Sequence, residues 1–310
     1  MARLTILMAT YNGERFLQDQ LNSFSRQSFY DWDLWVSDDG SSDNTKSILH
    51  NYDQEQNGHH KVCVIDGPHR GFVQNFLNLT CCCQNDSEFF AFSDQDDIWQ
   101  NDKLQRAINW LETVPTDVPA IYCSRTEIVD EDARPTSPPT YSPLMKVIPS
   151  FSNALVQSIA GGNTMVFNKA AKQLIESFGG VIDVPSHDWW VYLLVTGVGG
   201  KVYYDPISSL LYRQHRKNVV GSNRSLGALW IRLKKFMDGR YKNYNEKNVY
   251  YLTKCTPLLT KENQDRLAFF SQARKSSTLQ SIKALRKAGV RRNGFLFNTA
   301  LWIGVVIGRI

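Results

Sequence analysis

The 310-residue chain lacks the patterns that mark several common protein classes. Its six cysteines form no CxxC pair, so the sequence predicts free thiols in a reducing cytosol rather than a zinc site or a disulfide framework. No GxGxxG follows the first apolar run, which argues against a dinucleotide-binding dehydrogenase. The first residues run directly into a strand-like segment and lack the apolar core and cleavage site of a signal peptide.

Charge is unevenly distributed along the chain. Residues 1–215 carry 15 Lys and Arg against 26 Asp and Glu, whereas residues 216–310 carry 20 against 4. The first part has the balance of an acidic catalytic body, and the second is expected to meet an anionic surface. No nucleic-acid-binding motif accompanies the basic charge, so nucleic acid is not an expected partner.

Apolar runs alternate with segments of helical spacing in the first part of the chain. The expected strands are 4–10, 33–37, 61–65, 89–92 and 120–124, and the expected helices are 16–24, 43–52 and 72–79. This alternation predicts an α/β fold with a mostly parallel sheet. Ligands bind beyond the carboxyl ends of such strands. The polar clusters that follow the strands should therefore converge on one crevice: Thr10–Gly13, Asp38–Asp43, Arg70–Gly71 and Asp94–Asp97.

The densest of these clusters follows the apolar run at residues 89–92. Asp94, Asp96 and Asp97 place three carboxylates in four positions, where their charges repel and raise one another's pKa. A divalent cation such as Mg²⁺ or Mn²⁺ would remove that repulsion, and Mg²⁺ sites combine one or two carboxylates with substrate phosphates. A solvated acidic turn that caps the next helix is the other interpretation of this segment.

The later part of the chain is expected to be largely helical. Residues 130–149 hold five prolines and predict a loop on the acceptor side, and residues 202–212 contain strand-like stretches. The expected helices are 188–195, 226–237, 246–252, 264–273 and 279–287. The apolar segment 295–310 is shorter than the roughly 20 residues that span a bilayer. Because basic residues precede it, it suits an interfacial membrane anchor, and a helix packed on the core is the alternative.

Five motifs occur in an order that resembles a known family. They are TYNG at 10–13, DDGSSD at 38–43, SDQDDIW at 93–99, HDWW at 187–190 and YRQHRKNVVG at 212–221. Together they resemble the family 2 inverting glycosyltransferases of GT-A fold, and most of all the bacterial rhamnosyltransferase-type enzymes that build O-antigens and other surface polysaccharides. The resemblance covers roughly residues 3–221. The first two motifs belong to the whole family, and the last three are narrower.

The resemblance implies a domain organisation, a reaction and a location. A GT-A domain would span 1–221, with a Rossmann-like, mostly parallel sheet flanked by helices, and 222–310 would form a helical, basic, membrane-associating region. The implied donor is a nucleotide-sugar, dTDP-L-rhamnose above others, and the acceptor is a polyprenyl-diphosphate-linked glycan. Mg²⁺ or Mn²⁺ would be the cofactor. The implied location is cytoplasmic, peripheral on the inner face of the cell membrane.

On the donor side, the resemblance implies contacts with the pyrimidine ring from Asp39 and a role for Asp38 in orienting its loop or touching the ribose. Asp94 and Asp96 match the metal-binding DxD pattern, and His215 would contact the diphosphate or the metal. Arg213 is a further candidate phosphate partner. The full set expected to bind the nucleotide is Thr10, Tyr11, Asn12, Asp38, Asp39, Arg70 and Asp94.

On the acceptor side, Asp188 is the implied base that takes the proton of the acceptor hydroxyl. Read alone, an Asp before two tryptophans is a helix N-cap. Trp189 is expected either to stack on a sugar face or to pack its helix into the core. The set implied to contact donor or acceptor is Gly162, Asn163, Trp189 and His215.

Three other functions compete with this one. The same fold could use a UDP-hexose donor. A sugar nucleotidyltransferase would need a Gly-rich loop with Arg or Lys after the first strand, and the loop at residues 10–15 does not suit a triphosphate. A non-catalytic membrane scaffold would not need the acids at 39, 94, 96 and 188.

Overall fold

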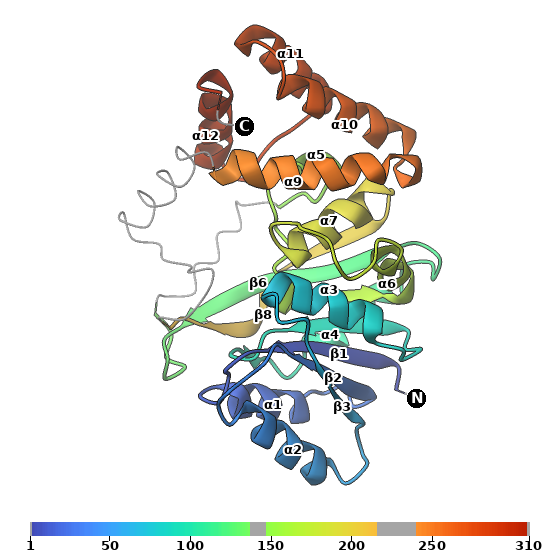
Figure 1. Ribbon diagram of the computed structural model, residues 1–310, viewed down its shortest axis with the longest axis vertical. Coiled ribbons are helices and arrows are strands. Elements are labelled where there is room, and N and C mark those ends of the chain that lie inside the picture. The colour runs from blue at the N-terminus through green and yellow to red at the C-terminus, as the bar shows by residue number, and fades with distance from the viewer. Residues whose placement is uncertain (1, 137–146, 216–239, 309–310) are drawn as a thin grey trace. The chain divides into compact units, whose positions relative to one another are not determined.

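The computed structural model describes residues 2–136, 147–215 and 240–308 (Figure 1). The expected helix at 226–237, the end of the fifth motif at 216–221 and residues 137–146 of the proline-rich loop lie outside the described residues. The chain forms two compact units. One comprises Met1–Tyr141, Ala160–Asp183 and Lys201–Asn218, and the other comprises Ser142–Ile159, Val184–Gly200 and Val219–Ile310.

The two units interleave along the chain. Their last boundary, like the predicted one between 221 and 222, falls outside the described residues. Two inner segments, one of which carries Asp188, nevertheless belong with the C-terminal helices rather than with the sheet. Asp188 and the Asp94–Asp97 cluster therefore come from different units.

The first unit is built on one mixed sheet. Its described strands are β1 Leu4–Thr10, β2 Trp32–Asp38, β3 Val62–Asp66, β4 Phe89–Ser93, β5 Ile98–Trp99, β6 Ala120–Val129, β7 Val166–Asn168 and β8 Lys201–Arg213. They lie in the order β3-β2-β1-β4-β7-β6-β8-β5. The half made of β3, β2, β1 and β4 is parallel, as predicted. In the other half β6 and β8 are parallel, while β7 and β5 pair antiparallel with their neighbours.

Helices cover both faces of this sheet (Figure 1). α1 (Leu17–Ser25), α2 (Thr45–Gln56) and α4 (Lys103–Leu111) share one core with alternate residues of β1 and β2. α3 (Phe72–Cys82) and α6 (Lys169–Glu176) pack together on the opposite face. Because β1 and β4 are buried along their whole length, they are continuous apolar runs, which is why the sequence pattern located them.

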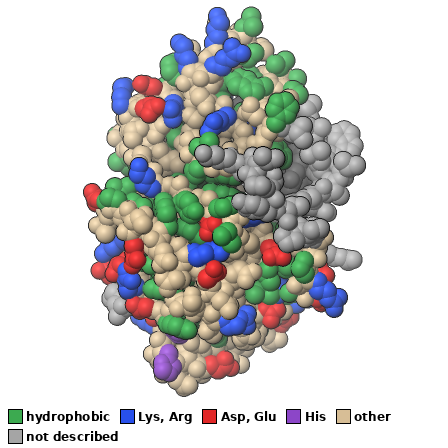
Figure 2. Space-filling model, turned by 180° about the vertical axis from the view of Figure 1, so that it is seen from behind, with side chains coloured by type: hydrophobic (Ala, Val, Ile, Leu, Met, Phe, Trp, Pro, Cys, Tyr) green, Lys and Arg blue, Asp and Glu red, His purple; other side chains and the backbone are tan. Residues whose placement is uncertain are grey.

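The second unit is helical in its described part. Its elements are α5 Phe151–Ala154, α7 His187–Gly197, α9 Arg240–Lys254, η2 Thr256–Leu258, α10 Lys261–Ala273, α11 Thr278–Ala288 and α12 Phe295–Val306. α12 packs Leu301 and Val305 inward and leaves Phe295, Ile303 and Val306 exposed. Over the described residues, no helix combines the length and the apolar character needed to cross a membrane. Lys and Arg side chains lie among exposed apolar side chains over the C-terminal helices (Figure 2).

Candidate functional site

The parallel strands bring their carboxyl ends to one edge, as predicted. In the sheet register Thr10 lies opposite Asp38, and Asp38 lies opposite Asp66. Beyond the strands the backbone continues the pairing, since Asp39 N donates to Thr10 O at 2.8 Å and Gly67 N donates to Asp38 O at 2.7 Å. The polar segments that follow β1, β2 and β3 therefore form one continuous surface.

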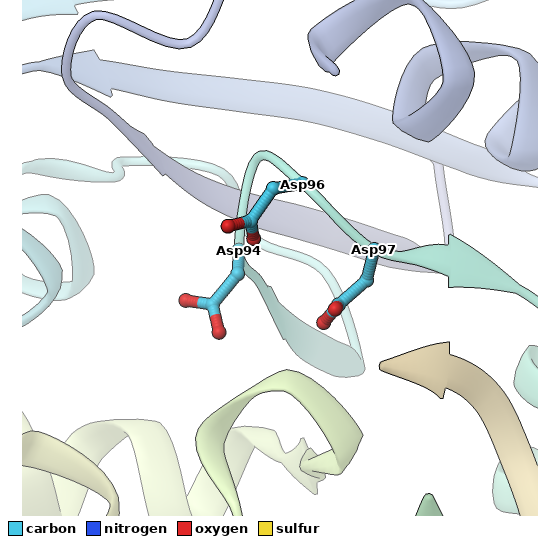
Figure 3. Close-up of side chains that lie close together, drawn as sticks. All are labelled: Asp94, Asp96 and Asp97. Carbon is cyan, nitrogen blue, oxygen red and sulfur yellow. The ribbon is translucent and has the colours of Figure 1, made fainter. Parts of the chain in front are cut away.

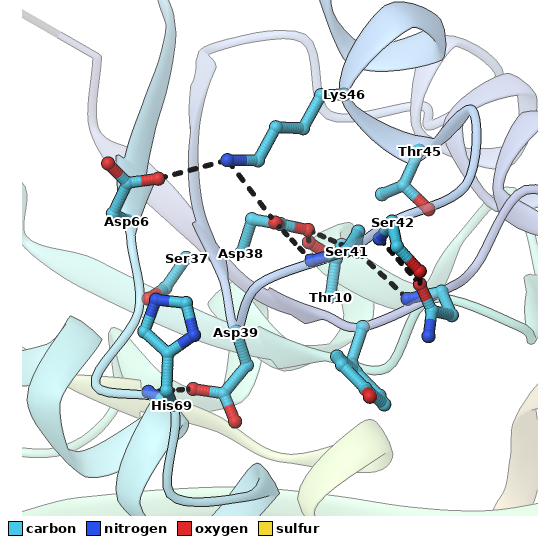
Figure 4. Close-up of polar contacts among 12 residues, drawn as sticks. Thr10, Ser37, Asp38, Asp39, Ser41, Ser42, Thr45, Lys46, Asp66 and His69 are labelled. Carbon is cyan, nitrogen blue, oxygen red and sulfur yellow. Dashed lines mark hydrogen bonds and ion pairs between the residues drawn. The ribbon is translucent and has the colours of Figure 1, made fainter.

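Asp38 is fully buried at the centre of this surface (Figure 4). Its carboxylate accepts hydrogen bonds from Thr10 Oγ1 at 2.9 Å, from Ser41 N at 2.8 Å and from Ser41 Oγ at 2.6 Å. Lys46 Nζ lies 3.8 Å away. These contacts fit the predicted role of Asp38 in orienting its loop, and they come from residues that hold the first two turns together.

Asp39 binds the loop that follows β3. Its Oδ1 accepts from His69 N at 2.7 Å and its Oδ2 from Gly71 N at 2.8 Å, and the residue is 8% exposed. His69 has a φ of 55°, an uncommon backbone conformation for a residue other than glycine. The two hydrogen bonds from His69 N and Gly71 N to the Asp39 carboxylate stabilise this conformation. The His69 ring lies against Gly40, where an added Cβ would come within 2.4 Å of Nδ1.

Gln95 joins the β1 turn to the acidic loop. Its side chain accepts from Tyr11 N and donates to Tyr11 O, both at 2.9 Å. Asn12 in turn connects the β1 turn to the β2 turn, because its N donates to Ser41 Oγ and its Oδ1 accepts from Ser42 N, both at 2.8 Å. Three of the turns that carry the predicted nucleotide-binding residues, those after β1, β2 and β4, are thus linked through side-chain-to-backbone bonds.

Asp94, Asp96 and Asp97 gather at the end of β4 (Figure 3). One carboxylate oxygen from each lies within 4.8 Å of the others. Three carboxylates at this separation repel one another unless a cation lies between them. Carboxylate oxygens are the ligands that Mg²⁺ prefers, so the donor set fits a hard divalent cation.

His215 lies beside this cluster. Its Nε2 is 2.7 Å from Asp96 Oδ2, and its ring packs against Phe16 with a centroid separation of 4.9 Å. The structure therefore brings together the three residues predicted to hold the metal, Asp94, Asp96 and His215.

Asp97 is fully buried and does not cap the next helix, because α4 begins only at Lys103 with Asp102 as its N-cap. Its Oδ2 accepts from Asn163 Nδ2 at 2.7 Å and its Oδ1 from Arg213 N at 3.3 Å. Burial, together with the neighbouring charges of Asp96 and Asp94, raises the pKa of Asp97 well above its usual value. Asp97 thus connects the acidic loop to the 3₁₀ turn η1 (Gly162–Thr164) and to the end of β8.

Arg213, a candidate phosphate partner, contacts the protein itself here, and its contact with phosphate stays a prediction. The residue is 2% exposed, and its guanidinium donates to Asp96 O at 3.1 Å and to Asp19 at 2.7 Å. It also lies over the Phe16 ring, 4.7 Å from the centroid. Arg213 therefore fixes the backbone of the acidic loop. Arg70, by contrast, is exposed, and its contact with phosphate stays a prediction.

Asp188 lies in the first turn of α7, whose N-cap is Ser186. The alternative in which Asp188 is itself the N-cap is therefore wrong by two positions. Its carboxylate accepts from Ser186 Oγ and from Trp189 N, contacts that orient it. Trp189 is 6% exposed and its indole donates to Ala154 O at 2.7 Å, so the structure favours core packing over sugar stacking for this ring.

Sequence reasoning missed two residues at this site. Gln95 lies inside the SDQDDIW string, but nothing in the string indicates that its amide bonds the backbone of another turn. Lys103 is fully buried, and its Nζ donates to Asn163 O. No signal in the sequence could have found it, because Trp99 lies in β5 and α4 begins only at Lys103, so helical spacing does not relate the two residues.

Comparison with known proteins gives a family for the chain. The family model described as Glycosyl transferase family 2 matches residues 5–174. The dTDP-rhamnosyl transferase RfbG of Shigella flexneri is 30% identical over 238 residues, which cover 73% of this chain and 78% of that protein. The Escherichia coli enzyme UDP-Glc:alpha-D-GlcNAc-diphosphoundecaprenol beta-1,3-glucosyltransferase WfgD is 28% identical over 108 residues, which cover 35% of this chain and 40% of that protein.

Solved structures share the fold at lower identity. The mannosyltransferase PcManGT from Pyrobaculum calidifontis, in complex with GDP-Man and Mn²⁺, aligns with a TM-score of 0.54 at 17% identity and covers 99% of this chain and 86% of that one. The S. aureus TarS 1–349 structure with UDP-GlcNAc aligns with a TM-score of 0.53 at 13% identity and covers 92% of this chain and 89% of that one. Both likenesses concern the fold.

Proposed function

The chain belongs to glycosyl transferase family 2, and from that premise we propose that it transfers L-rhamnose from dTDP-rhamnose to a lipid-linked glycan during the synthesis of a cell-surface polysaccharide. The chain is a glycosyltransferase enzyme of GT-A fold. The observation that carries the proposal is the gathering of Asp94, Asp96 and Asp97 at the strand edge that also carries the Asp38–Asp39 turn.

We assign the cofactor to the acidic loop. Asp94 and Asp96 would hold Mg²⁺ or Mn²⁺, with His215 beside them. When bound, the ion neutralises charge on the leaving nucleoside diphosphate. Asp39 and the turn at residues 10–12 would bind the nucleoside, since Gln95 links that turn to the acidic loop and Asp39 N donates to Thr10 O.

Asp188 is the proposed base for an inverting displacement. The acceptor hydroxyl oxygen forms the new bond to the anomeric carbon, the bond from that carbon to the diphosphate oxygen breaks, and the hydroxyl proton passes to the Asp188 carboxylate. Ser186 Oγ and Trp189 N donate to that carboxylate and would keep it oriented.

The names of the relatives support the choice of sugar and acceptor. A dTDP-rhamnosyl transferase aligns over most of the chain, which favours dTDP-rhamnose as donor. A second candidate is a UDP-glucose donor, because two relatives that align over shorter stretches are named as glucosyltransferases. Both of those names describe acceptors carried on diphosphoundecaprenol or PP-undecaprenol, which supports a lipid-diphosphate acceptor.

A lipid-linked acceptor requires the enzyme to work at a membrane, and we place this chain peripherally on the inner face of the cell membrane. Phe295 is 85% exposed, Ile303 56% and Val306 57%, in a region rich in Lys and Arg. Apolar side chains on a basic helical surface bind anionic bilayers. Vesicles with anionic lipid should retain the protein and release Ile303→Glu, whereas Ile207→Glu, at a 60% exposed position on β8, should behave as the parent chain.

The test of the function is a donor panel. Purified protein is given Mn²⁺, a polyprenyl-diphosphate-linked acceptor and dTDP-rhamnose, UDP-glucose, UDP-GlcNAc or GDP-mannose, each with and without EDTA. Transfer from dTDP-rhamnose that EDTA abolishes supports the proposal. Transfer from UDP-glucose alone would replace the donor, and no transfer from any donor would overturn the function.

The base is tested separately. Asp188→Asn should lower kcat by about 10²- to 10⁴-fold while leaving donor affinity unchanged, because the carboxylate acts on the acceptor. Asp117→Asn, a change at an exposed acid before β6, serves as the matched control. If Asp188→Asn instead lost donor affinity by as large a factor as it lost kcat, this residue would bind the donor rather than act as the base.

A further inference from the structure

Lys103 is a buried lysine in the first unit, which carries the sheet. It begins α4 and is 0% exposed. Its Nζ lies 3.5 Å from the centroid of the Trp99 ring and donates a hydrogen bond to Asn163 O. A fully buried lysine with a carbonyl and a ring as its contacts is costly for a fold and calls for an explanation.

Asn163 connects that lysine to the acidic loop. Its carbonyl accepts from Lys103, while its side-chain Nδ2 donates to Asp97 Oδ2 at 2.7 Å. Asp97 and Lys103 are both fully buried, so the asparagine bridges two ionisable side chains that have no access to solvent. Burial lowers the pKa of Lys103 well below that of an ordinary lysine, and the negative charges of Asp97 and Asp94 oppose that shift.

The bridge fixes a turn that the site needs. Asn163 lies in η1, whose Thr164 N donates to Gly161 O at 3.0 Å and whose following residue, Met165, donates to Gly162 O at 2.9 Å. Met165 O in turn accepts from Phe92 N in β4, directly before the acidic loop. The turn is thus held to the acidic loop on one side by Asp97 and to α4 on the other by Lys103.

We propose that Lys103 is a positioning residue of the donor site, whose buried amino group holds the Gly162–Asn163 turn and Asp97 in place beside the metal carboxylates. The inference rests on the proposed function, since it assigns Lys103 to the same metal and donor site. Lys103 itself touches neither metal nor sugar. Groups that orient metal ligands from behind typically change metal affinity or activity by about 10- to 100-fold when replaced.

The test compares Lys103→Met with two other variants. Mn²⁺ is titrated by electron paramagnetic resonance in the presence of dTDP. Lys103→Met should bind Mn²⁺ about 10- to 100-fold more weakly than the parent chain. Lys103→Arg keeps a cation and N–H donors and should recover part of that affinity. If Lys103→Met does not fold, Lys103→Gln, which keeps an N–H donor but no charge, is measured in its place with the same expectation.

Lys172 supplies the matched control. Its side chain is 8% exposed, its Nζ pairs with Glu176, and it lies over the Phe90 ring at 5.2 Å. Lys172→Met removes a comparable buried cation from α6 and should leave Mn²⁺ affinity unchanged. Equal affinities of the parent chain and Lys103→Met, or equal losses in both methionine variants, would overturn the inference.

A readout without metal separates this inference from the proposed function. Hydrogen exchange of the amides of Thr164 and Met165 should be faster in Lys103→Met than in the parent chain and unchanged in Lys172→Met. If the parent chain binds no Mn²⁺, the proposed metal site is wrong. Amide hydrogen exchange at Thr164 and Met165 then still decides the role of Lys103. Unchanged exchange in Lys103→Met would contradict it.

Discussion

The Asp38–Asp39 turn and the Asp94–Asp97 loop lie at the same edge of one sheet, and both carry adjacent carboxylates. The first turn surrounds its acids with donors from the chain: Asp38 accepts from Thr10 and Ser41, and Asp39 accepts from two backbone N–H groups. Those acids hold loops together, whatever else they bind.

The second loop crowds its acids instead. Oxygens of its three carboxylates lie within 4.8 Å of one another, and the neighbouring acids contribute to the raised pKa of Asp97. Three basic side chains lie nearby: His215 contacts Asp96, the Arg213 guanidinium donates to the Asp96 backbone, and Lys103 reaches Asp97 through Asn163. The first turn thus spreads its acids among backbone and hydroxyl donors, whereas the second brings three carboxylates together, the kind of donor set that suits a divalent cation.

The largest expected effect follows from removing one of the crowded acids. Asp96→Asn should lower kcat/KM for the donor by about 10²- to 10³-fold, because electrostatic stabilisation of the leaving group is lost. The free energy of unfolding without metal should stay equal or rise, since repulsion with Asp94 and Asp97 is relieved. Kinetics and urea unfolding measure both, with Asp117→Asn as control. An Asp96→Asn chain that is fully active and still sensitive to EDTA would place the metal elsewhere.

The opposite behaviour is expected in the first turn. Asp38→Asn should lower the free energy of unfolding by about 1.5 to 3 kcal/mol, because an amide group cannot accept from every donor that now faces the carboxylate. Mn²⁺ affinity should change little, since Asp38 is absent from the acidic cluster. Urea unfolding and a Mn²⁺ titration measure the two quantities. A stable Asp38→Asn chain that cannot bind Mn²⁺ would reverse the comparison.

The smallest expected effect sharpens the first turn further. Gly40 has a φ of +94°, and an added Cβ would lie 2.4 Å from His69 Nδ1, whereas Gly58 has a φ of +78° with nothing within 4 Å of such an atom. Both changes to Ala strain the backbone, by about 1 to 2 kcal/mol. Gly40→Ala should cost about 1 kcal/mol more, because the His69 ring must move. Equal unfolding free energies of the two variants would show that this ring moves without cost.

Much of the first unit could be predicted from the sequence. β1 and β4 are buried along their whole length and are therefore apolar runs, and the turns after them carry the polar motifs. β5 and β7 were missed because two or three residues carry no period, and each depends on pairing with a distant strand. A helix after the acidic segment was expected but without bounds, although the spacing of α4 is helical.

The candidate site could be predicted in its parts but not in its connections. The motif order indicated Asp94, Asp96 and His215, and the structure brings them together. The burial of Lys103 could not be predicted, because a lysine at a helix start is ordinarily exposed and its partner Asn163 is 60 residues away. Nor could the pattern show that the segment with Asp188 joins the C-terminal helices, since that grouping depends on long-range packing.

The central claim is that the Asp94–Asp97 loop binds a divalent cation and the Asp38–Asp39 turn does not. Urea unfolding with and without Mn²⁺ at about 100 times its Kd tests it most directly. The account predicts that Mn²⁺ raises the free energy of unfolding by about 2.7 kcal/mol in the parent chain and in Asp38→Asn, and leaves Asp96→Asn unchanged. Equal stabilisation of Asp96→Asn and the parent chain would contradict the account.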